Sequence, residues 1–393
     1  MKLVVSSGAL ESRVKNLRKV LGAKNVLPIL DSLLFEVVAD ENTAILTTSD
    51  SEIWLSYNID LEEVDDSVKF CVDAATLADM LSGIGEQPVT ISVDMDTCEL
   101  TLKHNDGSSY CPVEPADEYP MHADLDNSET MVTADGAVLK RAIKRSLWAA
   151  NRDTLRPIMN GVYFEFDNDR AGIVASDGHQ IMWTVAVLSH MNEWGSFVMP
   201  SKVAKILPDL IDDDDIILCF DSSRCSIKND QMDLHFRFID GKYPNFKSVF
   251  PEEFAHDVLC DRVGLINALQ SVNPFTPDSS NMAKLTFCKP DTLEISANDS
   301  ASAVGSTIRL QTSSDYTGDP TSIGIKASRL ITMLQKMTTK EVSVRFNDSS
   351  HAVCIVPYHD NYDKVSEIVK GMTMPMLLND DSNNHDDGQT TEG

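Results

Sequence analysis

The chain has few cysteines, and none of them are paired by spacing. It holds eight in 393 residues, with no Cys-x-x-Cys pair. Most lie in apolar, strand-like runs such as Leu218-Cys219-Phe220. Structural zinc sites and redox motifs usually need closely spaced cysteines. We therefore expect buried free thiols in a reducing compartment, without zinc or disulfides.

Several other signals are also missing from the sequence. No apolar run approaches the ~18 residues that a membrane-spanning helix needs. The apolar start at residues 1–8 is too short for a signal peptide and predicts a first strand. There is neither a glycine-rich phosphate loop nor a Gly-x-Ser-x-Gly elbow. Ser176, Asp177 and His179 are near neighbours in sequence, whereas a catalytic triad is assembled in space. The sequence thus predicts a cytoplasmic protein that is not an enzyme and needs no cofactor or metal.

Positive charge is scarce, with 33 Lys and Arg against 61 Asp and Glu and a net charge of −28. This balance alone disfavours nucleic acid, since duplex binding normally needs a basic footprint. Two segments depart from it: residues 11–24 carry a net charge of +4 and residues 139–156 a net charge of +5. Such segments are either solvated helix faces or parts of one shared functional surface.

One short sequence pattern occurs three times along the chain. Strand-like runs end in Thr-Ser-Asp, Ala-Ser-Asp and Ala-Asn-Asp, and their aspartates Asp50, Asp177 and Asp299 lie 127 and 122 residues apart. A second landmark, at 72–74, 199–201 and 325–327, repeats at intervals of 127 and 126 residues. A period of this length is the size of a domain and predicts a three-domain array. Both basic segments fall at the same place in their repeats.

Within each repeat, the hydrophobic pattern predicts an α+β fold. Apolar spacing indicates helices at 8–21, 74–82, 137–150, 201–210, 263–272 and 328–336, each followed by strand-like runs. Each repeat therefore reads as two β-α-β-β-β units, giving six units in the chain. We expect domains at 1–126, 127–253 and 254–378, followed by a disordered acidic tail at 379–393 that has no apolar side chain.

Two acidic features of the sequence each allow two interpretations. The run Asp212 to Asp215 suggests either calcium or a solvated turn, and it lacks the alternating ligands and glycine of an EF-hand loop. The repeated aspartates Asp50, Asp177 and Asp299 are either metal ligands or turn-forming residues. Their equivalence across the repeats favours turns.

Repeated units of this kind can join their sheets edge to edge, and a closed ring leaves no free edge. If the basic helices line one surface of such a ring, the interior is positive within a negative body. That arrangement suits a polyanion that passes through without adhering.

Five short motifs, in order, carry a family resemblance. Residues 175–181 (Ala-Ser-Asp-Gly-His-Gln-Ile) resemble the Thr-Asp-Gly-His-Arg-Leu signature of the bacterial DNA polymerase III beta subunit, the sliding clamp. Residues 27–30, 160–165, 240–246 and 374–376 are similar to further motifs of that family. The resemblance covers residues 1–378.

The resemblance implies a DNA clamp fold and a head-to-tail homodimer, whose six similar domains form a ring around double-stranded DNA. Such a processivity factor tethers the polymerase III alpha subunit and other clamp-motif proteins, and a clamp loader places it on DNA. Partners insert a linear peptide between the second and third domains. By motif position, the pocket would comprise Met159, Ser176, Gly178, His179, Gln180, Ile181, Pro244, Val249, Met372, Met374, Pro375 and Met376.

The DNA contacts that the resemblance implies are basic residues of the inner helices and loops. The candidates are Lys24, Arg152, Arg156, Lys15, Lys19, Lys140, Lys144 and Lys202. Two departures from the family pattern stand out: Gln180 replaces the usual Arg, and the chain continues past Met376 into the acidic tail. The alternative function is an acidic peptide-binding scaffold that does not encircle DNA.

Overall fold

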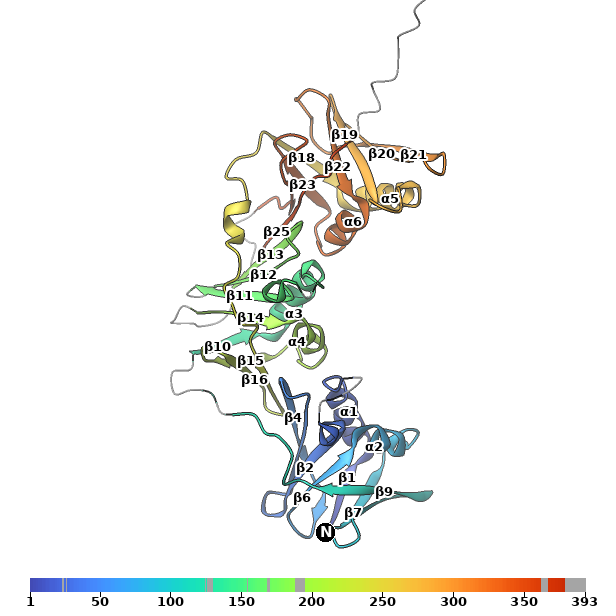
Figure 1. The fold of residues 1–393 in the computed structure, drawn as a ribbon, viewed down its shortest axis with the longest axis vertical. Coiled ribbons are helices and arrows are strands. Elements are labelled where there is room, and N and C mark those ends of the chain that lie inside the picture. Colours follow the sequence, from blue (N-terminus) through green and yellow to red (C-terminus); the bar gives the residue numbers. More distant parts are fainter. Residues whose placement is uncertain are drawn as a thin grey trace, which may run out of the picture. The chain divides into compact units, whose positions relative to one another are not determined.

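The computed structural model describes residues 1–22, 25, 27–123, 125, 130–153, 155–167, 170–187, 195–361 and 367–378. Its contacts divide the chain into two compact units. Figure 1 shows the helices and strands along the chain. The first unit comprises Met1–Leu147, Thr154–Gly172 and Val187–Lys242. The second comprises Trp148–Asp153, Ile173–Ala186 and Tyr243–Gly393. Lys24, the predicted boundary at residue 126 and the acidic tail lie outside the described residues.

The α-helices begin where the repeat predicts them. They are α1 (Ser7–Leu17), α2 (Ala74–Leu81), α3 (Gly136–Ser146), α4 (Ser201–Ile206), α5 (Arg262–Val272) and α6 (Ala327–Gln335). Three of them end about four residues earlier than predicted: α1, α3 and α4. Helix α1 stops at Leu17, and α4 passes at Leu207 into a 3₁₀ turn that contains Pro208, which has no N–H to continue the helical bonds.

The strands follow the helices in a regular order. Those of the first repeat are β1 (Lys2–Ser6), β2 (Ser32–Val38), β3 (Thr43–Ser49), β4 (Ile53–Asp60), β5 (Glu63–Val64), β6 (Val68–Asp73), β7 (Pro88–Asp94), β8 (Glu99–His104) and β9 (Gly107–Pro115). Those of the second are β10 (Thr130–Asp135), β11 (Gly161–Asp167), β12 (Arg170–Ser176), β13 (Gln180–Val187), β14 (Gly195–Pro200), β15 (Asp215–Phe220), β16 (Arg224–Lys228) and β17 (Met232–Arg237). Those of the third are β18 (His256–Asp261), β19 (Met282–Cys288), β20 (Thr292–Asp299), β21 (Val304–Gln311), β22 (Thr321–Lys326), β23 (Glu341–Phe346), β24 (Val353–Pro357) and β25 (Glu367–Thr373).

This element order confirms the six predicted β-α-β-β-β units. Each of β1, β6, β10, β14, β18 and β22 leads directly into a helix, and three strands follow that helix, with the short β5 added in the first unit. The first strand-like run after α1 begins at Ser32, because Pro28–Asp31 form a 3₁₀ turn.

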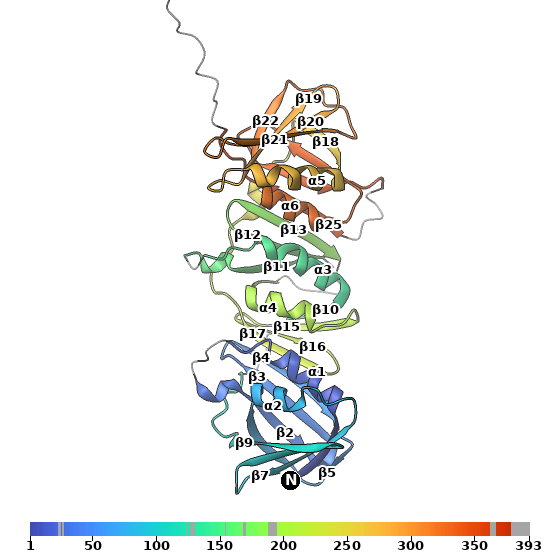
Figure 2. The ribbon, with the colours of Figure 1, turned by 90° about the vertical axis from the view of Figure 1, so that its right-hand side faces the viewer.

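The first compact unit is built on one long antiparallel sheet. Its 13 described strands follow the order β10-β15-β16-β17-β4-β3-β2-β6-β9-β8-β7-β1-β5. The joint between the first and second repeats is the pairing of β4 with β17, in which Ile53 lies opposite Phe236. Helices α1 to α4 lie on the same side of this sheet (Figures 1 and 2).

The second compact unit contains the corresponding joint between the second and third repeats. Strand β13 pairs with β25, and the sheet continues through β24 and β23 to β18. A further four-stranded sheet has the order β21-β20-β19-β22. The second repeat thus contributes strands to both units, because its β17 pairs with the first repeat and its β13 pairs with the third.

Helix starts are fixed by the last residue of the preceding strand. Ser6, Asp73, Asp135 and Asp261 each accept a hydrogen bond from the backbone N–H three residues later. Such N-caps satisfy donors that the first helical turn leaves unpaired. The strand-to-helix junction is therefore encoded by one short polar side chain in four of the six units.

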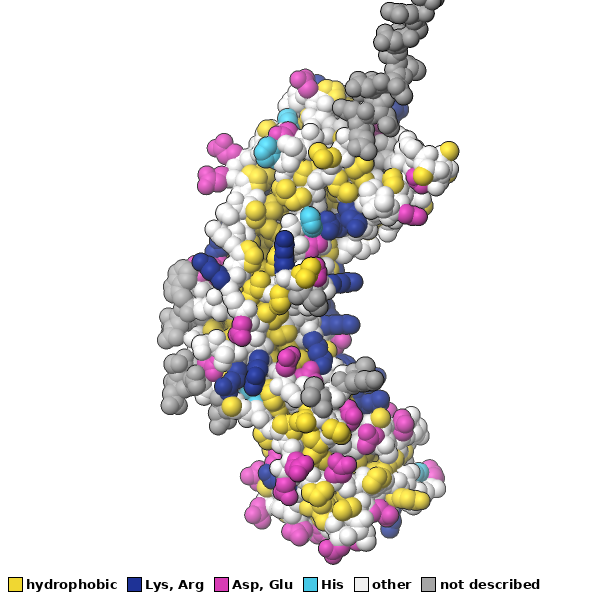
Figure 3. Space-filling view, in the orientation of Figure 1, with side chains coloured by type: hydrophobic (Ala, Val, Ile, Leu, Met, Phe, Trp, Pro, Cys, Tyr) yellow, Lys and Arg dark blue, Asp and Glu magenta, His cyan; other side chains and the backbone are white. Residues whose placement is uncertain are grey.

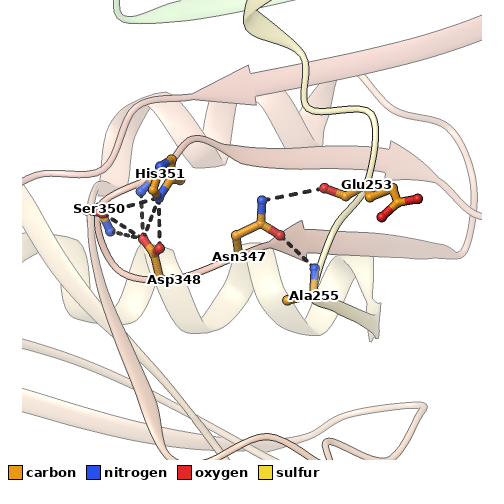
Figure 4. A network of polar contacts seen from close by, with 6 residues as sticks. All are labelled: Glu253, Ala255, Asn347, Asp348, Ser350 and His351. Atoms are coloured by element: carbon orange, nitrogen blue, oxygen red, sulfur yellow. Dashed lines mark hydrogen bonds and ion pairs between the residues drawn. The ribbon is translucent and has the colours of Figure 1, made fainter.

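The linker into the third repeat is held by the side chain of Asn347, at the end of β23 (Figure 4). The Asn347 Oδ1 accepts a hydrogen bond from Ala255 N at 2.6 Å, and its Nδ2 donates to the Glu253 carbonyl at 3.5 Å. In the next turn, the Asp348 carboxylate accepts bonds from the backbone N–H groups of Ser350 and His351. With the His351 ring, these bonds lower the pKa of Asp348.

The cysteines are largely as predicted. Six of the eight free thiols are buried, whereas Cys98 is exposed and Cys288 is half-buried. Burial raises the pKa of Cys71 and that of Cys260 to about 12. In the described part of the chain, no group of three or more His, Cys, Asp or Glu side chains is placed to hold a metal ion. Among the described residues there is also no helix with the length and apolar character to span a bilayer.

Candidate functional site

The signature segment forms a tight turn between β12 and β13. Asp177 Oδ1 accepts hydrogen bonds from His179 N at 2.8 Å and Gln180 N at 2.9 Å. The Ser176 hydroxyl donates to the Gln180 carbonyl at 2.8 Å and accepts from Gly178 N at 3.1 Å. Gly178 has a φ of 87°, a left-handed conformation that favours glycine. Asp177 and Ser176 therefore shape the turn, and the Ser176 hydroxyl is occupied within it.

The same turn recurs at the equivalent aspartates. Asp50 Oδ1 accepts from Glu52 N at 3.0 Å and from Ile53 N at 2.8 Å. Asp299 Oδ1 accepts from Ala301 N at 3.1 Å. An aspartate that bonds the backbone two or three residues on stabilises a turn locally. This geometry supports the turn reading of the repeated aspartates.

Two of these aspartates also form ion pairs with a helix of the following repeat. Asp177 Oδ2 lies 3.2 Å from Arg329 Nη2 on α6. Asp50 pairs in the same way with Lys202 on α4. Lys202, a predicted DNA contact, thus already has a carboxylate partner within the protein.

The last residues of the third repeat run alongside the signature turn. In the β13–β25 ladder, Ile181 lies opposite Met372. Beyond the ladder, Met374 N donates to the His179 carbonyl at 2.8 Å, and Met376 N donates to the Gly324 carbonyl at 2.7 Å. The Met374-Pro375-Met376 motif is therefore fixed between the turn and the edge of β22.

A cavity of about 1230 Å³ opens beside this segment. We call it the C-terminal groove; its wall includes His179, Met282, Met374, Pro375, Met376, Leu377 and Leu378. Methionine-rich apolar surfaces adapt to different ligands. Four of the predicted pocket residues, at 179, 374, 375 and 376, are thus brought together in one concave site.

Three cations that the sequence analysis missed also line the C-terminal groove: Lys284, Lys326 and Arg329. Two of them could have been found from the repeat, because Lys326 lies within the landmark at 325–327 and Arg329 lies two residues after it. The third lies on β19, where no motif marks it. Among the described lining residues, Asp299 is the only carboxylate that could balance these three positive charges. The groove therefore combines apolar walls with an excess of positive charge.

The remaining predicted pocket residues are not part of the wall of the groove. Ser176, Gln180, Ile181 and Met372 are buried. Pro244 and Val249 are exposed on the linker after β17. Met159 lies in the first compact unit, whereas the others lie in the second.

Two buried polar residues lie in the β13–β25 ladder, at the end next to the signature turn. Gln180 and Thr373 lie opposite each other in the β13–β25 ladder. Gln180 Oε1 and Thr373 Oγ1 are buried and have no hydrogen-bond partner in the described structure. Buried polar atoms are almost always paired, so these two are exceptions that call for an explanation.

Aromatic side chains hold the linker against the signature strand. The Trp183 ring meets Phe246 edge-on at a centroid distance of 5.2 Å and Phe250 at 5.4 Å. Lys370 Nζ lies 5.1 Å from the centroid of the Trp183 ring. These contacts bury the apolar anchors of the linker and leave Pro244 and Val249 at the surface.

The candidate DNA contacts differ in whether a neighbouring carboxylate already balances their positive charge. Lys140 Nζ lies 2.8 Å from Asp213 Oδ1, and its hydrogen bond and charge lower the pKa of that carboxyl. Lys144 lies 3.6 Å from Asp209 across an exposed surface. Figure 3 shows Lys and Arg side chains projecting beside α3 and α4. Lys15, Arg152 and Arg156 are exposed, and Lys19 is half-buried.

Three family models match successive parts of the chain. The N-terminal, central and C-terminal domains of the DNA polymerase III beta subunit match residues 1–124, 133–245 and 247–376. The beta sliding clamp of Proteus mirabilis is 24% identical over 356 residues, covering 90% of this chain and 95% of its own length.

Solved structures show the same fold. A sliding clamp from Pseudomonas aeruginosa bound to griselimycin has a TM-score of 0.89 at 21% identity, covering 96% of this chain and 100% of its own. The Helicobacter pylori beta clamp bound to a DNA ligase peptide has a TM-score of 0.85 at 19% identity, with the same coverage. The fold is thus a three-domain DNA clamp, and the chain belongs to the DNA polymerase III beta subunit family.

Proposed function

We propose that this chain is a DNA polymerase processivity factor, a sliding clamp that encircles duplex DNA and tethers the replicative polymerase. The observation that carries the proposal is the repeated joint between repeats. In the third repeat, the strand that corresponds to β4 and β13 is β21, and among the described strands one of its edges is unpaired. In the first repeat, the strand that corresponds to β17 and β25 is β9, whose first half pairs with β8.

The two joints are built alike. At the first, Arg237 N donates to the Glu52 carbonyl at 3.2 Å, just beyond the β4–β17 ladder. At the second, Met374 N donates to the His179 carbonyl at 2.8 Å, just beyond the β13–β25 ladder. Glu52 and His179 each lie two residues after the repeated aspartate. One rule therefore describes both joints: the strand after the aspartate turn pairs with the last strand of the next repeat.

Continuing that rule closes a ring. The strand after the aspartate turn of the third repeat is β21, which ends its sheet and pairs with β20 alone among the described strands. The last strand of the first repeat is β9, whose first half pairs with β8 and exposes Tyr110 to 75%. Pairing β21 with β9 of a second copy, twice, gives a head-to-tail homodimer of six domains.

Within this ring, the basic helices supply loose contacts to DNA. We propose Lys15, Lys19, Lys24, Lys140, Lys144, Arg152, Arg156 and Lys202 as the residues that face the duplex. The ion pairs of Lys140, Lys144 and Lys202 reduce the charge that they offer. A clamp has no need of tight phosphate contacts, because its hold on DNA is topological.

Tethering is assigned to the C-terminal groove and the signature turn. We propose that a linear peptide of the polymerase III alpha subunit, of the clamp loader or of another partner binds to the twelve residues listed above. The apolar walls of the groove suit Leu and Phe anchors. Gln180 Oε1 and Thr373 Oγ1 would accept hydrogen bonds from a glutamine amide of the peptide.

The proposal also includes the compartment, the lack of catalytic activity and the domain boundaries. The chain is a non-catalytic protein of the cytoplasm, with domains at 1–126, 127–253 and 254–378 and an acidic tail at 379–393 that lies outside the described residues. The acidic-scaffold alternative shares the groove but not the ring. Primer extension on a primed single-stranded circle separates the two. With polymerase, clamp loader and ATP, this chain should convert short products into full-length ones, whereas a scaffold would leave product length unchanged.

A further inference from the structure

One side of the C-terminal groove is a cationic face of the four-stranded sheet in the third repeat. Lys284 on β19 and Lys326 at the end of β22 both line the groove. In the β19–β22 ladder, Lys284 lies opposite Gly324, and Lys326 comes two residues after Gly324 on the same strand. Residues two apart on a strand point to the same face of the sheet. The two ammonium groups therefore belong to one face, beside the apolar wall of the groove.

These two lysines keep their positive charge within the described part of the chain. Among the described residues, Lys284 and Lys326 form no ion pair, whereas the third cation of the groove, Arg329, is held by Asp177. Lys284 is exposed and Lys326 is half-buried. Two neighbouring cations on one face create a positive potential there. In a chain with a net charge of −28, this face is a place that favours a negatively charged ligand.

The last described residues of the chain lie on the same face. Met376 forms an isolated antiparallel bridge with Gly324. A Cβ atom on Gly324 would lie 3.0 Å from Leu378 Cδ2 and 2.9 Å from Met282 Sδ. The Leu378 side chain therefore packs over Gly324, one strand away from Lys284. The segment that follows Leu378 starts inside the wall of the groove and beside the two lysines.

That segment, the acidic tail at 379–393, has the opposite charge. Its first two acids come two and three residues after Leu378, a span of at most about 7–11 Å. Neighbouring strands lie about 5 Å apart, so these carboxylates can reach the ammonium group of Lys284. Tethering gives the tail an effective concentration in the millimolar range, so weak contacts are enough to dock it. The tail has no Lys or Arg, and its five acids are Asp380, Asp381, Asp386, Asp387 and Glu392.

We propose that the acidic tail docks in the C-terminal groove of its own chain, with Asp380 and Asp381 against Lys284 and Lys326, and competes with partner peptides. The inference rests on the proposed function, because the groove is the proposed peptide site. The tail acts as an internal competitor, which a peptide with well-fitting apolar anchors displaces. The choice of the tail over an acidic partner rests on its start at Leu378 and on its charge.

Calorimetry measures the competition with the peptide Gln-Leu-Ser-Leu-Phe, which has the glutamine and the apolar anchors of the proposed site. Truncation after Leu378 should tighten binding about fivefold at low salt, as expected for the loss of two exposed ion pairs. High salt screens such pairs and should abolish the difference. In a Lys284→Ser, Lys326→Ser double variant, truncation should have no further effect, because the tail has already lost its partners.

Two controls accompany this comparison. Lys340→Ser removes an exposed cation of the same compact unit that is not part of the groove wall, so truncation should still tighten binding about fivefold in that variant. Replacing the five acids of the tail by their amides keeps its length and should have the same effect as truncation. Thermal melts exclude variants that do not fold.

Carbodiimide crosslinking locates the tail without any peptide. The reagent activates a carboxylate, the lysine amine attacks the activated carbon and loses a proton, and an amide forms while the carbodiimide leaves as a urea carrying the carboxylate oxygen. In the full chain, mass spectrometry of the product with the mass of one chain should find Asp380 or Asp381 joined to Lys284 or Lys326.

Three outcomes would overturn the proposal. The first is equal peptide affinity of the full and truncated chains at low salt. The second is tightening by truncation that persists in the Lys284→Ser, Lys326→Ser variant. The third is tail crosslinks that fall on Lys340 as often as on Lys284. Peptide binding to neither form would contradict the proposed function instead, and the crosslinks would still decide where the tail docks, so the two failures can be told apart.

Discussion

The Asp177 carboxylate joins the signature turn to the helix that walls the C-terminal groove, through the 3.2 Å contact between its Oδ2 and Arg329 Nη2. Both side chains are largely buried, being 17% and 25% exposed. The same carboxylate holds the turn through its other oxygen. One aspartate therefore sets both the shape of the turn and its distance from α6.

Replacing Arg329 tests this coupling. Arg329→Ala leaves the turn bonds of Asp177 intact but removes the link to α6, so the groove should bind Gln-Leu-Ser-Leu-Phe several-fold more weakly. Because the pair is only partly buried, the loss of stability should be about 1 kcal/mol. Calorimetry with the peptide and a thermal melt measure the two effects. Arg309→Ala, which breaks an exposed ion pair with Glu294, is the control. Unchanged peptide affinity in Arg329→Ala would contradict the coupling.

Gln180 should contribute to binding at the expense of stability. Its Oε1 is buried without a hydrogen-bond partner in the described structure. Gln180→Leu removes that unpaired atom, so stability should stay the same or rise by about 1 kcal/mol. Affinity for Gln-Leu-Ser-Leu-Phe should fall, because an acceptor for the peptide amide is lost. A substitution that lowers stability and leaves affinity unchanged would show that Gln180 has only a structural role.

Gly136 marks a close approach of α3 to the acidic turn. A Cβ atom there would lie 2.4 Å from the Asp212 carbonyl oxygen and 2.5 Å from that of Asp214. Both neighbours are backbone atoms, so Gly136→Ala should destabilise the protein by about 1–3 kcal/mol, as overpacking does. Gly85→Ala is the control, since no atom lies within 4 Å of its Cβ position. Equal melting temperatures of the two variants would refute the close approach.

The thiols should differ sharply in reactivity. Burial raises the pKa of Cys260 to about 12 and that of Cys354 to about 11, so both stay protonated and inaccessible at pH 8. Cys98 is exposed and should react first with Ellman's reagent. In native protein, we expect one fast thiol, which Cys98→Ser removes. Unfolding in guanidinium should release the rest. Several fast thiols in the native protein would contradict the buried positions.

Charge reversal should separate DNA contact from peptide binding. Arg152→Glu and Arg156→Glu remove two exposed cations, so the salt dependence of DNA binding should weaken by about one unit of slope for each. Affinity for Gln-Leu-Ser-Leu-Phe should not change. Lys69→Glu, on the far strand β6 of the first repeat, is a suitable control for net charge. Parallel loss of both activities would point to misfolding instead.

The repeats made most of the fold predictable. The landmark at 72–74, 199–201 and 325–327 located the starts of α2, α4 and α6, and apolar spacing located those of α1, α3 and α5 to within one residue. The strand-to-helix junction was predictable because it depends on a short local pattern, often with a capping residue such as Asp135 or Asp261. Helix ends were less predictable. In α1, the apolar spacing runs on to Leu21, but the helix stops at Leu17, since tertiary packing and not periodicity decides the last turn.

The candidate site was predictable only where a motif marked it. His179 and Met374 to Met376 were found because contiguous residues carry the resemblance. Lys284 was missed because no motif marks it on β19, and it meets the other groove residues only in the folded chain. The stacked rings of His122 and His235 were missed for the same reason, because the two residues are 113 positions apart and no linear pattern shows that they meet.

Topological retention on DNA tests the central claim most directly. The chain is loaded onto nicked circular DNA with clamp loader and ATP, washed at high salt, and measured before and after the circle is linearised. A ring should remain on the circle at high salt and be lost once the DNA is cut, because nothing but closure holds it. Retention that falls with salt and ignores the cut would contradict the account, since it would reflect ordinary electrostatic contact with the duplex.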